Sequence, residues 1–175
     1  MTNAIYPGTF DPVHYGHIDI ATRAAEMFDH LTIAIYDRPL KHLLFATEER
    51  RRMIEVAVKG VPNIAVATYN QLTVEYAKAV GARVVVRGLR VISDFELEFQ
   101  MALTNKKLAP EIEFVCLMTS EEYAFLSAST VKEIAMLGGC VTGMVPSNVA
   151  EAMKSKFEGP GGEEQKRVAL VSLRD

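Results

Sequence analysis

The residues best suited to chemistry stand in a loop that follows the first apolar run of this 175-residue chain. Residues 7–17 read PGTFDPVHYGH, with Gly8 near the start and two histidines, His14 and His17, three residues apart. A glycine lets the backbone approach a ligand closely, and the amides at the start of the following helix favour a phosphate. The pattern indicates a phosphate site to which an imidazole donates a hydrogen bond. A tight turn with two surface histidines is the alternative, and zinc is disfavoured because no third ligand of the right type is nearby.

Two later segments have compositions that suit phosphate groups. Residues 87–90 read RGLR directly after an apolar run, and two guanidinium groups that flank a glycine match a multiply charged phosphate. Residues 127–132 read SASTVK, in which the serines, the lysine and the amides of a helix start can hold a phosphate chain. A helix N-cap explains the serines almost as well. A third cluster, Arg38, Lys41 and His42, is by itself an ordinary set of solvated charges.

The reaction class is narrowed by the motifs that the sequence lacks. It contains no nucleophile elbow, no pair of catalytic carboxylates, no GxxxxGK[ST] run and no GxGxxG run. What remains are groups that bind and polarise phosphates. They predict in-line phosphoryl or nucleotidyl transfer, in which positioning and charge stabilisation provide most of the catalysis.

Short β-branched runs alternate along the chain with longer stretches of helical period. The short runs are almost continuously apolar, as strands of a parallel sheet covered on both faces are. We therefore predict an α/β fold, a doubly wound, Rossmann-like parallel sheet of five strands with helices on both faces. Ligands of such sheets bind beyond the carboxyl ends of the strands. The predicted strands are residues 4–6, 31–35, 64–68, 84–86 and 114–118, and the predicted helices are residues 18–28, 48–59, 73–80, 95–108, 130–137 and 147–157.

Polar residues and glycines predict where several of these helices begin and end. Thr47 stands before two glutamates, and Asp94 stands before the helix expected at residue 95. Thr130 has the spacing of a capping box with Glu133, and the glycine pair at 138–139 predicts the end of that helix.

Composition predicts one globular domain, residues 1–158, followed by a Gly/Pro joint and short C-terminal tail, residues 159–175. Hydrophobic residues make up 49% of the chain and the net charge is −3, so nucleic acid and membrane are not expected as partners. The first residues lack a signal-peptide pattern and no apolar run is long enough to span a bilayer, so we expect a cytoplasmic protein. The two cysteines have no metal or disulfide spacing, and Cys116, in an apolar run, is predicted to be buried and inert.

Taken together, several of these segments resemble one known family. YPGTFDP followed by HxGH resembles the T/HxGH nucleotidyltransferases, and residues 127–132 resemble their second, ISSTxxK-type signature. Within that superfamily, AIYPGTFDP, GHIDI, FATEER, VVRGLR, SDFELEFQMA and SxSTVKE stand in the order and spacing of the phosphopantetheine adenylyltransferases, over residues 4–157. The resemblance implies transfer of AMP from ATP to 4′-phosphopantetheine with Mg²⁺, giving dephospho-coenzyme A and pyrophosphate, the penultimate step of coenzyme A biosynthesis. It also implies a homohexamer and coenzyme A as a feedback ligand.

The same resemblance assigns roles to individual residues. His17 falls at the residue that stabilises the pentavalent transition state, and Lys41 and Arg90 are the other catalytic candidates. No residue is expected to ligate a metal. The residues matched to phosphopantetheine are Thr9, Lys41, Thr73 and Arg87, and those matched to ATP are Thr9, Phe10, His17, Gly88, Leu89, Arg90, Glu98, Tyr123, Ala124, Phe125, Leu126, Ser127, Ala128 and Ser129.

The chain departs from the family pattern at a few positions. His14 and Tyr15 replace the usual Thr and Asn, Ala128 stands where a serine is common, and Thr73 stands where a larger apolar residue is frequent. Two rival enzymes are a nicotinate-mononucleotide adenylyltransferase and a glycerol-phosphate cytidylyltransferase, and residues 87–90 and 93–102 argue against both. A nucleotide-binding sensor without catalysis is a further alternative.

Overall fold

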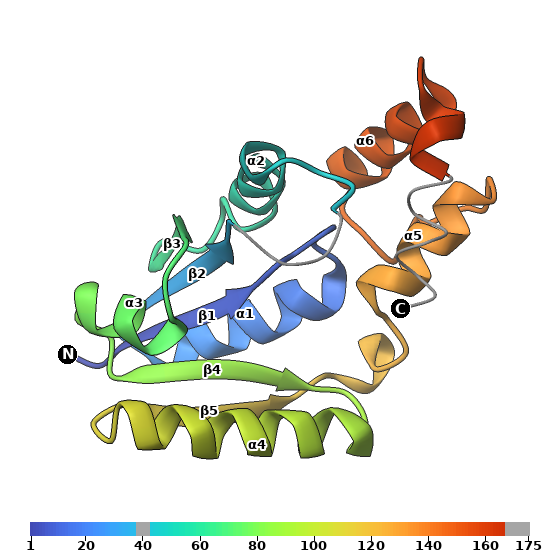
Figure 1. Cartoon of the computed structure of the whole chain (residues 1–175). Helices are drawn as coiled ribbons and strands as arrows, with labels where there is room; N and C mark the ends of the chain where they lie inside the picture. The colour runs from blue at the N-terminus through green and yellow to red at the C-terminus, as the bar shows by residue number, and fades with distance from the viewer. Residues whose placement is uncertain (38–42, 167–175) are drawn as a thin grey trace.

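A computed structural model describes residues 1–37 and 43–166 of the chain. Strands and helices alternate in the predicted order (Figure 1). A short 3₁₀ helix, Glu121–Tyr123, follows the fifth strand. The strands are β1 (Asn3–Gly8), β2 (His30–Tyr36), β3 (Ile64–Tyr69), β4 (Val84–Leu89) and β5 (Glu113–Met118), and the α-helices are α1 (Tyr15–Met27), α2 (Thr47–Ala57), α3 (Thr73–Ala79), α4 (Ile92–Leu108), α5 (Ala128–Met136) and α6 (Ser147–Glu158).

The five strands form one parallel sheet in the order β3-β2-β1-β4-β5. The order reverses between β1 and β4, because the chain first moves outward through β2 and β3 and then returns to the other side of β1. Right-handed crossovers place helices before and after this reversal on opposite faces of the sheet. The predicted doubly wound α/β fold is therefore confirmed. At the reversal the loops that leave β1 and β4 diverge, and this opens a crevice.

Alternate residues of the strands pack on the two faces. Ala4 and Tyr6 of β1 join a large apolar cluster with α1 and α2, whereas Ile5 between them joins a smaller cluster with α3. On α1 the buried residues include Ala21, Ala24 and Ala25, whose small side chains let the helix lie close to the sheet. The helices α5 and α6 lie at the end of the sheet to which the strand arrows point (Figure 1). No helix in the described ranges is long and apolar enough to cross a membrane.

Four predicted helix starts are wrong by one to three residues, and α1 begins at Tyr15 instead of residue 18. Ala46, not Thr47, is the N-cap of α2, and its N–H donates to the carboxylate of Glu49 at 2.8 Å. The helix α5 begins at Ala128 with Ser127 as its cap, so Thr130 donates its N–H to the Ser127 hydroxyl (3.0 Å) instead of capping. Asp94 lies inside the first turn of α4, where it binds an arginine. At the starts of α2, α5 and α4 these contacts join residues that are only three or four apart in the sequence.

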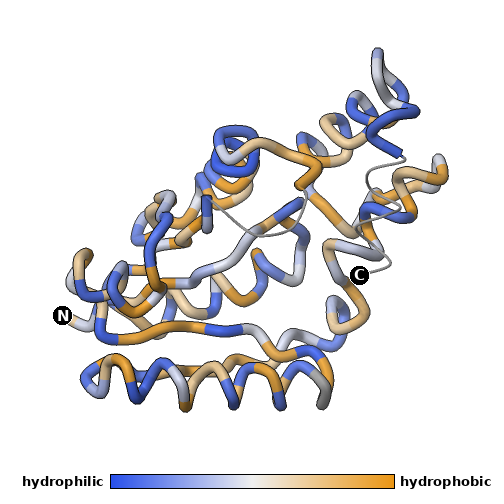
Figure 2. The backbone as a smooth tube through the Cα atoms, in the orientation of Figure 1, coloured by the Kyte–Doolittle hydropathy of each residue, from blue (hydrophilic) through white to orange (hydrophobic). Residues whose placement is uncertain are grey.

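The end of α5 is as predicted, but the predicted burial of Cys116 is wrong. Gly138 has a φ of 79°, and the following N–H, of Gly139, donates to the Ile134 carbonyl at 2.8 Å, so the glycine pair ends the helix. Cys116 is exposed and lies on the edge strand β5, which has a neighbouring strand on one side only. Apolar residues recur along the whole of α4 (Figure 2), and large ones such as Phe95 are about half exposed.

The helix α6 is predicted to belong to the single domain, and its packing suggests a direct test. Met153 is fully buried within the main apolar cluster. Met153→Ala should lower the free energy of unfolding by roughly 2–5 kcal/mol, because the cavity adds to the lost burial. Lys154→Ala, at an exposed neighbouring position, should change it by less than about 0.5 kcal/mol. A urea transition measured by circular dichroism checks this. A loss equal to that of the control, or a second transition, would show that α6 is not part of one domain.

Candidate active site

A cavity of about 380 Å³ lies at the reversal of strand order, beyond the carboxyl ends of β1 and β4. Its walls come from three parts of the chain that are distant in the sequence. They are the β1–α1 loop with the first turn of α1, the β4–α4 loop with the first turns of α4, and the start of α5. These are the three segments that the sequence predicts to bind phosphates.

The β1–α1 loop turns sharply at Phe10, whose φ of 51° lies in the left-handed region. The Phe10 ring is buried and lies nearly perpendicular to the rings of Tyr6 and His17, at centroid distances of 5.4 and 5.0 Å. A side chain at Gly8 could not share this space, because a Cβ there would lie 2.8 Å from the Phe10 ring. The predicted close approach at Gly8 therefore serves the packing of Phe10 as well as any ligand.

His14 and His17 stack face to face at the start of α1. Their ring centroids are 3.7 Å apart with an interplanar angle of 20°. The backbone N–H of His14 donates to Nδ1 of His17 at 3.3 Å. Since Nδ1 accepts, a neutral His17 carries its proton on Nε2. His17 lines the cavity, so its Nε2–H is available as a donor there.

Both imidazoles are held in the neutral form. Burial lowers the pKa of His14 to about 4, and the positive charge of Arg90 acts in the same direction. Burial also lowers the pKa of His17 well below its usual value, with further contributions from His14, Arg90 and Arg87. An imidazolium would lose hydration and meet two guanidinium groups, so the charged form is disfavoured. His17 is therefore a neutral hydrogen-bond donor at physiological pH.

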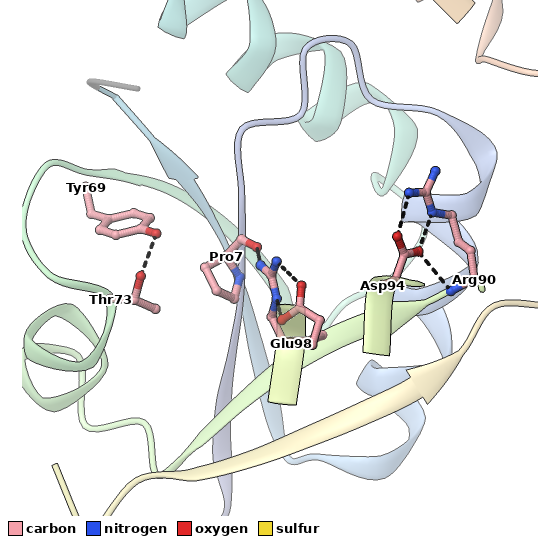
Figure 3. A network of polar contacts seen from close by, with 7 residues as sticks. Pro7, Tyr69, Thr73, Arg90, Asp94 and Glu98 are labelled. Carbon is pink, nitrogen blue, oxygen red and sulfur yellow. Dashed lines mark hydrogen bonds and ion pairs between the residues drawn. The ribbon is translucent and has the colours of Figure 1, made fainter. Parts of the chain in front are cut away.

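Two arginines of the β4–α4 segment are fixed by carboxylates of α4 (Figure 3). Arg87 donates to both oxygens of Glu98 at 2.7 and 2.5 Å and to the Pro7 carbonyl at 2.8 Å. Arg90 donates to both oxygens of Asp94 at 2.9 and 3.2 Å. Bidentate contacts of this kind fix the plane of a guanidinium group. Each group retains N–H donors beyond those that these contacts use.

The start of α5 is joined to the β4–α4 loop. Nη1 of Arg90 donates to the Leu126 carbonyl at 2.8 Å, directly before the cap residue Ser127. Ser129 and Ala128 lie in the first turn of α5 and line the cavity. Free amides at a helix start attract an anion, so this turn suits a phosphate chain.

A buried ion pair lies between the first loop and α5. Asp11 accepts from the ammonium of Lys132 at 3.1 Å and from the N–H groups of Leu44 and Phe45 at 3.0 and 2.9 Å. Both side chains are at most one-tenth exposed. One carboxylate thus connects the β1–α1 loop, the segment before α2 and the helix α5.

The charges of the cavity lining balance within the described part of the chain. Three cations face three carboxylates as the pairs Arg87–Glu98, Arg90–Asp94 and Lys132–Asp11. The described residues include no group of three or more side chains that could hold a metal ion. Because each of these carboxylates already binds a cation, the described lining provides no cage for a divalent metal.

Most of the predicted site residues are brought together, and a few are not. Thr73 starts α3 and pairs with Tyr69 (Oγ1 to the phenol oxygen, 3.1 Å), apart from the cavity lining (Figure 3). Lys41 and its neighbours Arg38 and His42 lie outside the described residues. Leu89, Tyr123, Ala124, Phe125 and Leu126 are outside the lining, while Thr9, Phe10, His17, Arg87, Gly88, Arg90, Glu98, Ser127, Ala128 and Ser129 are part of it.

Sequence reasoning missed some residues that the geometry singles out. Asp11 and Asp94 line the cavity, but the sequence analysis assigns no role to Asp11 and only a helix cap to Asp94. Arg50 is fully buried next to the first loop. Helical spacing could have found it, because Arg50 lies three and four residues before the buried Met53 and Ile54 on one face of α2.

Comparison with known proteins agrees with this geometry. Residues 5–134 match the family model described as cytidylyltransferase-like. The chain is 53% identical over 161 residues to the phosphopantetheine adenylyltransferase of Carboxydothermus hydrogenoformans, covering 92% of this chain and 99% of that protein. It is 52% identical over 157 residues to the protein of that name from Roseiflexus sp., covering 90% and 98% of the two chains. The chain belongs to the phosphopantetheine adenylyltransferase family.

Membership in this family makes the chain a nucleotidyltransferase, as the sequence motifs imply. The cavity brings together the kinds of hydrogen-bond donor that such a reaction requires. Two guanidinium groups, a neutral imidazole N–H and a helix start all face one space. Groups held before the substrate arrives stabilise developing charge without reorganising.

The neutral donor at His17 leads to a prediction about two histidine variants. His17→Ala should lower kcat by roughly 10²–10³-fold, the usual effect of losing one preorganised donor. The dissociation constant for ATP should change much less, because the arginines and the α5 turn remain. His14→Thr should be milder, since a threonine at this position keeps the backbone N–H that binds Nδ1 of His17.

Steady-state kinetics and calorimetric titration with ATP measure both quantities. A near-normal kcat with weak ATP binding in His17→Ala would show that His17 only binds the ground state.

Proposed function

We propose that this chain transfers the adenylyl group of ATP to 4′-phosphopantetheine, forming dephospho-coenzyme A and releasing pyrophosphate. The observation that carries the proposal is the neutral His17 beside Arg87 and Arg90, in a cavity whose lining carries the family's two signatures. Curated relatives that are about half identical over nearly their whole length carry the name of this activity.

The chemistry requires little from the protein beyond positioning. An oxygen of the phosphopantetheine phosphate forms a bond to the α-phosphorus of ATP, while the bond from that phosphorus to the bridging oxygen breaks. The electron pair leaves with pyrophosphate. A phosphate monoester is already largely ionised at neutral pH, so no general base is needed. This agrees with a site in which the sequence offers no nucleophile with a partnered base.

The arginines reduce the repulsion between the two substrates. Arg87 and Arg90 present their remaining N–H groups to phosphates while carboxylates hold them in place. His17 donates through Nε2 to an α-phosphate oxygen, and this bond strengthens as charge develops there. We assign Lys41 to the same task on the basis of the family pattern. The fixed guanidinium groups orient both substrates for in-line attack.

The individual contacts follow the family assignment given above. Thr9, Lys41, Thr73 and Arg87 are the proposed contacts to phosphopantetheine. Glu98 is a proposed ATP contact, and its carboxylate also orients Arg87. The other proposed ATP contacts are Thr9, Phe10, His17, Gly88, Leu89, Arg90 and the run of residues 123–129.

We propose that Mg²⁺ accompanies ATP and is not held by the protein alone. Magnesium commonly binds substrate phosphates and retains several waters. The cavity carboxylates Asp11, Asp94 and Glu98 are already bound to cations, so they do not supply a ligand set. We assign no step of the reaction to the metal.

Assembly and regulation follow from the same resemblance. We propose a homohexamer, and the exposed apolar side chains of α4 supply a surface that a second copy can cover. Leu97 and Glu98 of this helix also line the cavity, so such an interface would adjoin the site. Coenzyme A shares its pantetheine and adenine groups with the reactants, so it is the proposed feedback ligand. A cytoplasmic location is part of the proposal. The exposed apolar side chains of α4 that would form the proposed interface are Phe95, Leu97, Phe99, Met101 and Leu103.

Comparing two acceptor substrates is the most direct test of this function. With ATP and Mg²⁺, pyrophosphate release with phosphopantetheine should exceed that with nicotinate mononucleotide by roughly 10²-fold or more, because cavity groups left unpaired discriminate strongly. A coupled pyrophosphate assay with mass analysis of the product provides the measurement. Replacement of ATP by CTP is the control for the cytidylyltransferase alternative. Comparable turnover of the two acceptors would contradict the assignment, and no turnover with either would favour a nucleotide-binding sensor.

A further inference from the structure

Arg50 of α2 is the largest fully buried side chain of the described residues, and it carries a charge. Its Nη1 donates to the carbonyls of Thr9 (2.6 Å) and Tyr36 (3.1 Å), and its Nη2 donates to the hydroxyl of Thr47 (2.8 Å). All three acceptors are neutral. Its Nε is buried without a hydrogen-bond partner among the described residues.

Burial of the Arg50 charge lowers the stability of the folded protein. A buried charge without a paired carboxylate loses hydration that neutral acceptors replace only in part. Burial accordingly lowers the pKa of Arg50, while Asp11 and Asp37 act in the opposite direction. An apolar side chain of similar length would fill the same space on α2 at lower cost, as Met53 and Ile54 do one turn later on the same face. Local rules broken in this way are typical of functional sites.

The contacts of Arg50 meet at the carboxyl ends of two neighbouring strands. Thr9 follows β1 directly, and Tyr36 is the last residue of β2. The Thr47 hydroxyl donates in turn to Asp37 at 2.5 Å, which joins the start of α2 to the residue after β2. One guanidinium group therefore fixes the strand ends and α2 relative to one another.

The contact to Thr9 bears most directly on the site. The Thr9 carbonyl belongs to the peptide that precedes Phe10, whose φ of 51° turns the chain into the cavity. The Phe10 ring then packs against the His17 ring in a T-shaped contact. A peptide that leads into a left-handed residue needs a partner to stay in that orientation. Arg50 supplies this partner from outside the cavity lining.

We propose that Arg50 is a positioning residue for adenylyl transfer. It holds the Thr9–Phe10 peptide in the orientation in which Thr9 meets both substrates and Phe10 supports His17. The role of Thr9 rests on the proposed function. Arg50 itself does not touch the substrates and acts through the loop.

The test compares three substitutions on α2. Arg50→Met removes the donors, and Arg50→Lys keeps the charge but has one compact donor group. Ile54→Ala damages the same buried face of α2 without removing a hydrogen bond to the loop. Arg51→Gln is the matched control, because Arg51 is the neighbouring arginine and forms ion pairs with Glu48 and Glu55 at the surface. Rates are normalised to the folded fraction measured by circular dichroism.

Arg50→Met should raise KM for both ATP and phosphopantetheine by about tenfold, because both meet Thr9 and a lost hydrogen bond to a charged donor has an effect of this size. Arg50→Lys should fall between wild type and Arg50→Met, since lysine cannot reproduce the planar fork. Ile54→Ala should lower Tm with both KM values unchanged, and Arg51→Gln should match wild type. The dissociation constant for ATP, measured by calorimetry, should rise with KM.

Unchanged KM values and ATP affinity in Arg50→Met would overturn the proposal and leave Arg50 a purely structural residue. The same holds if Ile54→Ala raises both KM values as much as Arg50→Met does. Failure of the proposed function is distinguishable, because the wild type would then lack turnover with phosphopantetheine while ATP affinity still reports on Arg50.

Discussion

Repulsion between phosphate groups is the constraint on which the rest of this structure depends. In the proposed reaction, two negatively charged substrates have to approach within bonding distance. The described lining of the cavity carries three cations that are already paired with carboxylates. The pairs fix the directions of the guanidinium groups and lower the repulsion among the three cations. Burial is the main reason why both histidines are neutral, and the positive charge of Arg90 acts in the same direction on their pKa values.

The fold supplies this arrangement because all strand ends of a parallel sheet point to one edge. The β1–α1 loop, the β4–α4 loop and the start of α5 meet there although up to 121 residues separate Asp11 from Lys132. Buried polar contacts then set the details. Asp11 joins three segments, and Arg50 joins two strand ends to a helix. Partners fixed in this way keep the donors in place before a substrate binds, as electrostatic catalysis requires.

Much of the fold could be predicted from the sequence, because its signals are local. Apolar runs define all five strands, and the glycines at 138–139 end α5 as expected. The helix starts are harder to predict than the strands. Both Ser127 and Thr130 have side chains that can cap α5, and only the fold shows that Ser127 does so. Cys116 was wrongly predicted to be buried, because an apolar run does not show which strand lies at the edge of the sheet.

In the candidate site, too, local sequence signals could be predicted, whereas contacts between distant residues could not. Residue types and motifs predict three phosphate-binding segments, and the structure brings His17, Arg87 and Arg90 of these segments to one cavity. Pairings between distant residues, such as Lys132 with Asp11, leave no periodic trace in a single sequence. The tautomer of His17 depends on a backbone N–H that only the start of α1 provides. Lys41, for which the resemblance implies catalytic and substrate-binding roles, lies outside the described residues.

The central claim is that His17 is a neutral donor with its proton on Nε2. Nitrogen-15 NMR of the histidine side chains from pH 8 to pH 5, with His17→Ala for assignment, tests it most directly. We predict an unprotonated Nδ1 and a protonated Nε2 for His17, with no titration near pH 6.5 for His17 or His14. Because the unfolded state binds these protons more readily, folding stability should decrease as the pH falls below about 6.5. A His17 that titrates at or above pH 6.5, or that carries its proton on Nδ1, would contradict the account.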